Sequence, residues 1–362
     1  MTTIEEKIRE IEEEIHKTKY NKATESHIGL LKAKMAKLQL DADKAGHSGG
    51  KGGFSIPKSG DASVALVGYP NVGKSSLLNA ITGTESEVGN FAFTTLTVIP
   101  GTLKYKGTQI QILDLPGIID NAALGSGRGR EVLSMVRAVD LILFISDIEC
   151  KGMERIIEEL RKSGIVVNRK RKNISMKRMN TGGIKIRKPR SLELNEDRIK
   201  AIAKEFKLTN LELYIRENIT DDDLIDFFRG NVVYIPALMV INKIDMPHDE
   251  KKIGEMKRFG KVVRVSASSK VGVDELKEAL YDKLNLVRVF LRNKGGVIDY
   301  ERPLVLTEGA TIREVCRKIS REMIESFRYA IITSESAKIR DMRVGLDYGV
   351  TDGDIVTIIS KF

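Results

Sequence analysis

The chain has 362 residues, of which 41% are hydrophobic and 30% charged, and its net charge is +10 at pH 7. A chain of this length is expected to form more than one domain, because single cores split beyond about 250–300 residues. No apolar run approaches bilayer length and no leader pattern is present, so we expect a cytoplasmic protein with no membrane partner. Cys150 and Cys316 fit no metal or redox spacing.

Residues 1–50 are expected to form a helical hairpin followed by a Gly-rich linker. Apolar side chains recur at alternating intervals of four and three residues, at Ile4, Ile8, Ile11 and Ile15. A second apolar stripe runs through residues 28–38, and glycines at 49, 50, 52 and 53 then mark the linker. The apolar faces of the two helices are expected to pack on each other or on the next domain.

Residues 60–287 have the pattern of an α/β domain with a mostly parallel sheet. Short apolar runs recur there, at residues 64–67, 110–113, 141–145, 238–241 and 262–265. Helical or loop segments separate these runs, as in sheets flanked by helices. The third and fourth runs lie too far apart for one crossover helix, so residues 151–230 are expected to be an insert.

Residues 288–362 are expected to form a compact α+β domain. Short apolar runs alternate there with one helix, which is expected near residues 312–324. The turn Asp352-Gly-Asp354 precedes the last run and suits a tight reversal, so we interpret it as structural.

The most informative motif, GYPNVGKS at residues 68–75, lies between an apolar run and a helical pattern. A phosphate-binding loop requires this context of strand, loop and helix. Lys74 would place its charge on the β- and γ-phosphates, and Ser75 would offer its hydroxyl to Mg²⁺. The nucleotide-binding candidates in this segment are Gly68, Tyr69, Pro70, Asn71, Val72, Gly73, Lys74, Ser75 and Ser76.

Two further segments are expected to contact the γ-phosphate and the metal ion. Asp114 ends an apolar run, so its carboxylate would lie near Mg²⁺, while the Gly117 N–H would meet the γ-phosphate. Phe93, Thr94 and Thr95 lie where a loop would wrap over the nucleotide. We select Thr95 as the second metal hydroxyl, with Thr94 as the alternative. Loss of the γ-phosphate would relax both segments, as in a switch.

Base recognition is expected after the run at residues 238–241, where Asn242, Lys243 and Asp245 follow. The Asp245 carboxylate can accept hydrogen bonds from the N1–H and exocyclic amine of guanine, which adenine does not offer in this pattern. The motif therefore predicts GTP rather than ATP. An ATPase remains the alternative if Asp245 does not contact the base. A backbone contact to the guanine oxygen is expected from Ser266, Ala267 and Ser268.

Positive charge is concentrated in residues 161–190, which hold twelve Lys and Arg residues and no acidic residue. This excess is larger than the net charge of the whole chain, so the remainder is slightly acidic. Such a basic segment can neutralise backbone phosphates, which favours RNA or another polyanion as a partner. The alternative is a solvated surface loop.

The motifs resemble those of the developmentally regulated GTP-binding (DRG) proteins, in the Obg superfamily of translation-factor-related GTPases. The resemblance spans the chain and includes the segments that begin at Gly68, Phe93, Asp114 and Arg128. It implies an N-terminal helical segment, an inserted α/β element and a C-terminal TGS domain with a ubiquitin-like β-grasp fold. It further implies a slow GTPase that binds the ribosome or its RNA through residues 161–190 and the TGS domain, and a dedicated regulatory protein partner.

Ile118 stands where many GTPases carry the glutamine that orients attacking water. Similar proteins with a hydrophobic residue there use a loop asparagine to hold K⁺ near the bridge between the β- and γ-phosphates, and Asn71 matches it. The resemblance thus implies K⁺ stimulation, with the positive charge in the place of an arginine finger. The expected catalytic residues are Lys74, Asn71, Thr95 and Gly117.

Arg128 and Arg130 are an alternative source of that positive charge, because a mobile switch loop would bring one of them to the phosphates. An alternative for the whole protein is a scaffold that recruits partner proteins through its helical hairpin and TGS domain. In that case bound nucleotide would serve to stabilise the fold.

Overall fold

The computed structural model describes residues 3–19, 21, 24–46, 60–82, 99–115, 127–293, 295–334 and 338–361. The chain divides into two compact units that are not contiguous in sequence. Unit 1 joins Met1–Gly53 with Glu158–Tyr234, and unit 2 joins Phe54–Ile157 with Ile235–Phe362. None of the helices in the described ranges is long and apolar enough to cross a bilayer.

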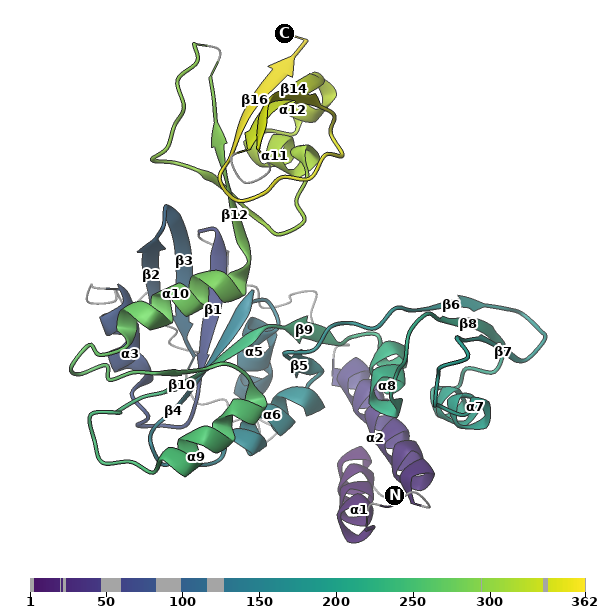
Figure 1. Ribbon diagram of the computed structural model, residues 1–362. Helices are drawn as coiled ribbons and strands as arrows, with labels where there is room; N and C mark the ends of the chain where they lie inside the picture. Colours follow the sequence, from purple (N-terminus) through teal and green to yellow (C-terminus); the bar gives the residue numbers. More distant parts are fainter. Residues whose placement is uncertain are drawn as a thin grey trace. The chain divides into compact units, whose positions relative to one another are not determined.

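Unit 2 contains a six-stranded sheet in the order β11-β10-β4-β1-β3-β2, with β2 and β3 antiparallel and the other pairs parallel (Figure 1). Its strands are β1 (Ala62–Val67), β2 (Ile99–Tyr105), β3 (Thr108–Asp114), β4 (Leu141–Ser146), β10 (Ala237–Ile241) and β11 (Val262–Arg264). β1, β4 and β10 are buried along their whole lengths, as expected of parallel strands covered on both faces.

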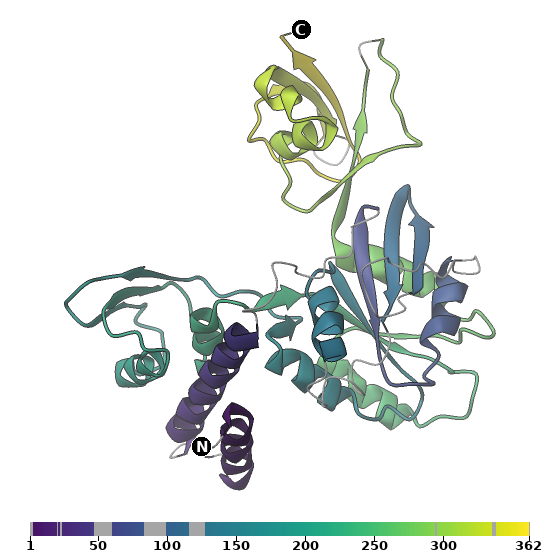
Figure 2. The same cartoon turned by 180° about the vertical axis from the view of Figure 1, so that it is seen from behind.

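Helices cover both faces of this sheet. They are α3 (Lys74–Thr82), α5 (Gly127–Val136), α6 (Met153–Lys162), α9 (Glu250–Glu255) and α10 (Val273–Leu284), with a 3₁₀ turn at Met256–Phe259. Leu77 of α3 and Leu276 of α10 share a core with Val64 of β1, and α5 lies on the opposite face (Figures 1 and 2). In such an open α/β sheet, ligands bind beyond the carboxyl ends of the strands.

The C-terminal part of unit 2 forms a five-stranded sheet in the order β13-β12-β16-β14-β15. The elements are β12 (Leu286–Leu291), β13 (Leu304–Thr307), α11 (Ile312–Ile319), α12 (Glu322–Glu325), β14 (Phe327–Ser334), β15 (Ile339–Val344) and β16 (Asp354–Ser360). Where the sequence predicted one helix near residues 312–324, there are two, because Ser320 adopts extended backbone and ends α11. In the turn before β16, Asp352 accepts hydrogen bonds from the backbone N–H (2.7 Å) and the guanidinium (2.7 Å) of Arg288, which is a structural use of that turn.

Unit 1 joins the N-terminal helices to the residues inserted between β4 and β10. Its elements are α1 (Ile4–Lys17), α2 (Glu25–Gly46), β5 (Ile165–Val167), β6 (Ile174–Arg178), β7 (Ile184–Arg187), α7 (Glu196–Glu205), β8 (Leu211–Ile215), α8 (Asp221–Arg229) and β9 (Val233–Ile235). Ala33 of α2 is fully buried in a core with Ile202 of α7 and Leu224 of α8. The second N-terminal helix therefore packs on the insert as well as on α1.

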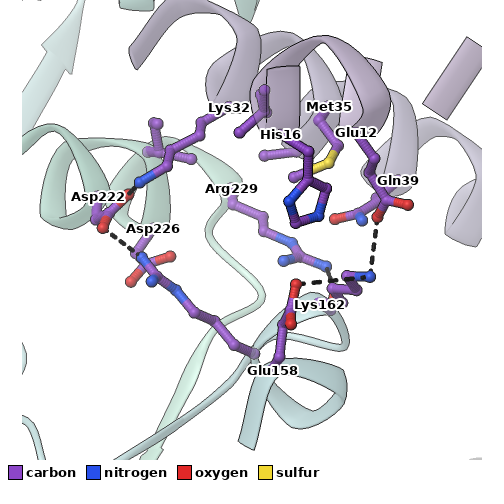
Figure 3. A pocket seen from close by; sticks show the side chains of 14 residues that line it. Glu12, His16, Lys32, Met35, Gln39, Glu158, Lys162, Asp222, Asp226 and Arg229 are labelled. Atoms are coloured by element: carbon purple, nitrogen blue, oxygen red, sulfur yellow. Dashed lines mark hydrogen bonds and ion pairs between the residues drawn. The ribbon is translucent and has the colours of Figure 1, made fainter. Parts of the chain in front are cut away.

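A cavity of about 200 Å³ within unit 1 lies between α1, α2, α8 and residues 158–162 of α6, the part of that helix that belongs to unit 1 (Figure 3). Ion pairs surround it: Arg161 binds Asp222 at 2.6 Å, and Lys162 binds Glu12 at 2.9 Å. Burial raises the pKa of Asp226, which lines the same cavity, to about 6. None of the predicted nucleotide motifs contributes a residue to this cavity.

Candidate nucleotide-binding site

The loop between β1 and α3 depends on two glycines for its path. A Cβ on Gly68 would lie 2.2 Å from the carbonyl oxygen of Ile145, so only glycine lets the loop pass the end of β4. Gly73 has a φ of +90°, and a Cβ there would lie 2.3 Å from Nδ2 of Asn242. Both glycines let the backbone follow a tight path with its N–H groups available to a phosphate, as phosphate-binding loops require.

Helix α3 begins at Lys74, directly after this loop. The first N–H groups of a helix have no partner within the helix, and together with the helix dipole they favour an anion. The Lys74 ammonium donates to the carbonyl oxygens of Gly68 (3.1 Å) and Tyr69 (3.0 Å). These contacts hold the ammonium at the mouth of the loop, and Ser75 and Ser76 beside it are exposed.

A hydroxyl and a carboxylate meet beside the start of α3. The Ser75 hydroxyl donates a 2.6 Å hydrogen bond to Oδ2 of Asp114, the last residue of β3. Asp114 is 7% exposed and pairs in register with Leu66 of β1, which places its carboxylate at the carboxyl edge of the sheet. Mg²⁺ takes one or two protein oxygens and completes its shell with phosphate oxygens and water. The residues present therefore fit a magnesium-bound nucleotide.

Asn242 ties the phosphate loop to the loop that follows β11. It is 2% exposed, its Nδ2 donates to the carbonyl oxygen of Val72 (2.9 Å), and its Oδ1 accepts from the N–H of Ala267 (3.1 Å). Lys243 makes a second link to the phosphate loop, because its ammonium donates to the carbonyl oxygen of Asn71 at 2.8 Å. Three predicted segments thus form one connected hydrogen-bond network.

Asp245 is exposed beyond β10 and is held by the serines of the following loop. A hydrogen bond from Ser266 is the main cause that lowers the pKa of Asp245, with a smaller contribution from Ser268. The two serine hydroxyls lie 3.0 Å apart, and Ser266 is fully buried. The carboxylate is therefore ionised and oriented at neutral pH, in the form that accepts hydrogen bonds.

Several predicted site residues fall outside the described ranges. Phe93, Thr94, Thr95, Gly117 and Ile118 are among them. Their predicted roles, including the choice between Thr94 and Thr95, stay predictions. The same holds for Arg128 and Arg130, which belong to α5 but whose side chains are not described.

Two residues of this site were missed by sequence reasoning. Asp147 follows β4 and lies 3.8 Å from the Lys243 ammonium, so it anchors the base-binding motif. Its signal was an acidic residue directly after a buried apolar strand. Gly152 has a φ of +73° and a Cβ there would lie 2.3 Å from the Tyr69 ring, a contact that no local pattern could reveal.

Three family models match the chain in succession. Residues 63–176 match a family described as 50S ribosome-binding GTPase, and residues 181–286 match the C-terminal region of the same domain. Residues 287–360 match the TGS domain, so the five-stranded sheet belongs to that domain. Together with the parallel sheet, these matches show a P-loop GTPase domain joined to a TGS domain.

Full-length relatives are similar over almost the entire chain. An uncharacterised GTP-binding protein of Methanocaldococcus jannaschii is 47% identical over 99% of this chain and 93% of its own length. Developmentally-regulated GTP-binding protein 1 of Xenopus laevis is 43% identical and covers 98% of each chain. Developmentally-regulated GTP-binding protein 2 of mouse is 41% identical over 98% of this chain and 99% of its own. Among solved structures, a YchF GTPase of Schizosaccharomyces pombe matches 83% of this chain and 98% of its own, with 16% identity and a TM-score of 0.44.

Proposed function

Because this chain belongs to the family of developmentally regulated GTP-binding proteins, which are GTPases, we propose that it hydrolyses GTP slowly with Mg²⁺ as a ribosome- or RNA-associated switch. The observation that carries the proposal is the 2.6 Å contact between Ser75 and Asp114 beside the first turn of α3. It supplies the two oxygen ligands expected for the magnesium ion of a bound nucleotide.

Each residue of the connected network has a role in this proposal. The start of α3 and Lys74 bind the phosphates, and bound Mg²⁺ would neutralise charge that develops on the β- and γ-phosphate oxygens. Asn242 holds the phosphate loop and the Ala267 loop at a set spacing, while Asp245 accepts from guanine. This preorganisation orients the nucleotide before reaction, which lowers the cost of reaching the transition state.

K⁺ stimulation is the finer part of the proposal and rests on Asn71. Asn71 is exposed and has a φ of +64°, a left-handed conformation that asparagine tolerates better than most residues. The Lys243 ammonium donates to the carbonyl oxygen of Asn71, which holds the backbone in place. The amide side chain of Asn71 takes no part in this contact. We propose that the amide oxygen helps bind K⁺ near the phosphates.

The test compares GTP hydrolysis in matched K⁺ and Na⁺ buffers, both with Mg²⁺. The wild type is expected to turn over faster in K⁺, and Asn71→Gly should lose this difference while it keeps GTP affinity, because glycine accepts the same φ. Asn285→Gly is the control, since Asn285 also has a positive φ (+48°) but lies at the end of α10. Equal rates of the wild type in the two buffers would contradict K⁺ stimulation and favour Arg128 or Arg130.

Ribosome association is supported by exposed positive charge and by the name of the matching family model. Arg169, Lys170 and Arg171 are exposed, and none of them forms an ion pair with another described residue. Exchange of all three for glutamine should weaken cosedimentation with ribosomes and flatten its salt dependence, because fewer counterions are released. Cosedimentation equal to that of the wild type at every salt concentration would count against the proposal.

A further inference from the structure

The sheet β6-β8-β7 of unit 1 has one covered and one open face. Leu211, Leu213 and Ile215 of β8 point to the covered face and are buried against α7. Figures 1 and 2 show α7 on that side of the sheet, and no other described helix of unit 1 covers the opposite side. Because side chains alternate along a strand, the neighbours of the buried residues must lie on the open side.

The strand register identifies the side chains of this open face. Across from Glu212 of β8 stand Lys177 of β6 and Lys185 of β7. Across from Tyr214 stand Ser175 of β6 and Arg187 of β7. We use the name open face for the set Ser175, Lys177, Lys185, Arg187, Glu212, Tyr214 and Arg216.

The open face keeps a net positive charge after its internal contacts are counted. Arg187 pairs with Glu212 at 2.6 Å, and the arginine remains 71% exposed. Among the residues that the structure describes, Arg216 donates to the neutral oxygens of Asn173 (3.1 Å) and Ser175 (3.2 Å) and forms no ion pair. Lys177 and Lys185 are exposed and form no ion pair within the described part of the chain. Only one of the four cations is therefore neutralised.

Other cations of the basic segment are used differently. Arg161, Lys162 and Lys172 each form an ion pair inside unit 1, with Asp222, Glu12 and Glu217. Their charges are largely compensated within the fold. The exposed cations of the segment therefore lie on the open face, on the loop at residues 169–171 and at Arg178 and Arg190.

An aromatic ring stands among these cations. Tyr214 is partly exposed, and the Arg187 guanidinium lies 5.9 Å from the centre of its ring. The Tyr214 hydroxyl is hydrogen-bonded to Glu212, and Lys177 and Lys185 stand one position further along the sheet. An aromatic ring with cations nearby is an arrangement with which proteins bind single-stranded nucleic acid, because a base stacks on the ring and cations follow the backbone. In a duplex the bases are stacked on one another and cannot reach the ring.

We propose that the open face binds single-stranded RNA, with one base stacked on Tyr214 and the sugar–phosphate backbone passing over Lys177, Lys185 and Arg216. The inference rests on the proposed function only in its choice of RNA as the polyanion. A three-stranded sheet is about 10 Å wide, which matches one strand of a few nucleotides better than a duplex.

The experiment measures binding of a fluorescent 12-nucleotide oligouridine to the full chain over a series of salt concentrations. The double variant Lys177→Gln/Lys185→Gln should bind several-fold more weakly, and its salt slope should fall by about 1.4. The matched control is Lys204→Gln/Lys207→Gln, which removes two exposed lysines at and after α7, on the covered side of the sheet. This control should retain wild-type affinity.

Stacking is tested separately at Tyr214. Tyr214→Ala should weaken binding about 10-fold, whereas Tyr214→Phe should stay within about 2-fold of the wild type because the ring remains. Equal affinities of the alanine variant and the wild type would overturn the proposal. So would a preference for duplex RNA, or displacement of the oligouridine by poly-glutamate at equal charge, which would indicate an acidic protein as the partner.

GTP hydrolysis of every variant is measured in parallel, and each should match the wild type. If the wild type fails to hydrolyse GTP but binds oligouridine as described, the proposed function fails and the open-face proposal stands. If hydrolysis is normal and the variants bind oligouridine unchanged, only the open-face proposal fails.

Discussion

Two constraints act against a side chain at position 73: the positive φ of Gly73 and the close approach of the Asn242 side chain. Alanine there would be strained by about 1–2 kcal/mol at the positive φ and would also displace Asn242. Since Asn242 links the phosphate loop to Ala267, we expect Gly73→Ala to lower GTP affinity at least about 10-fold and to lower the free energy of unfolding. Titration with fluorescent GTP and denaturant unfolding measure the two effects.

Gly254→Ala is the matched control for this variant. Gly254 lies inside α9, and a Cβ there would meet no atom within 4 Å. Alanine at this position should keep GTP affinity and raise the free energy of unfolding by about 0.5–1 kcal/mol. A Gly73→Ala variant that binds GTP as tightly as this control would show that the loop tolerates a side chain.

Asp245 tests the assignment of the base. Asparagine replaces one acceptor oxygen of the carboxylate by an NH₂ donor, which would oppose the exocyclic amine of guanine. We expect Asp245→Asn to lose about 10- to 100-fold in GTP affinity and to gain affinity for xanthosine triphosphate, which carries an oxygen at that position. Competition between the two nucleotides measures the change. If ATP competes as well as GTP for the wild type, the predicted guanine specificity is wrong.

Helix α8 carries a carboxyl group, Asp226, whose shifted pKa is expected to make the stability of unit 1 depend on pH. Asp226 faces Arg161 of α6 and shares α8 with Asp222, Asp223 and Arg229, and burial raises its pKa to about 6. The folded state therefore binds the Asp226 proton more tightly than the unfolded state. Its contribution to stability is complete below the ordinary aspartate pKa and is lost as the pH rises through about 6.

We therefore expect Asp226→Asn to raise the melting temperature at pH 8 and to change it little at pH 5, because the amide carries no buried charge. Asp222→Asn is the contrasting variant. It breaks the ion pairs with Arg161 (2.6 Å) and Lys32 (3.2 Å) and should lower the melting temperature at both pH values. If the melting temperature of Asp226→Asn depends on pH in the same way as that of the wild type, another group is responsible for the dependence.

The division of the chain into two units predicts two separable unfolding transitions. All described residues of the nucleotide network belong to unit 2. A non-hydrolysable GTP analogue at 100 times its Kd should therefore stabilise one transition by about 2.7 kcal/mol and leave the other unchanged. Differential scanning calorimetry with and without the analogue makes the comparison, and equal shifts of both transitions would contradict the assignment.

Removal of residues 1–46 should act on the other transition. Ile28, Leu31, Ala33 and Ala36 of α2 are all buried, so their loss exposes apolar surface of unit 1 at about 25 cal/mol per Å². The truncated chain is expected to lose or lower the transition that the GTP analogue leaves unchanged, and to keep its GTP affinity. Weaker GTP binding by the truncated chain would show that the N-terminal helices contribute to the nucleotide site.

The sequence by itself determined the phosphate-binding loop, the parallel sheet and the family. These depend on contiguous patterns: Gly68 to Ser75 between a strand and a helix, and apolar runs of strand length. The C-terminal domain was also predictable. The structure has two helices where the sequence predicted one, because Ser320 ends α11. Local backbone preferences and hydrogen bonds carry this information within a few residues.

Only the tertiary structure decided how distant segments combine. Asn242 contacts both Val72 and Ala267, and residues 1–53 share a unit with residues 158–234. Which cations of the basic segment are accessible is also decided only by the fold: Arg161 is paired with Asp222, whereas Lys177, across from Glu212 of another strand, is exposed and forms no ion pair among the described residues. Burial and ion pairing depend on the neighbours that folding provides, so no local pattern of charge distinguishes a compensated cation from an accessible one.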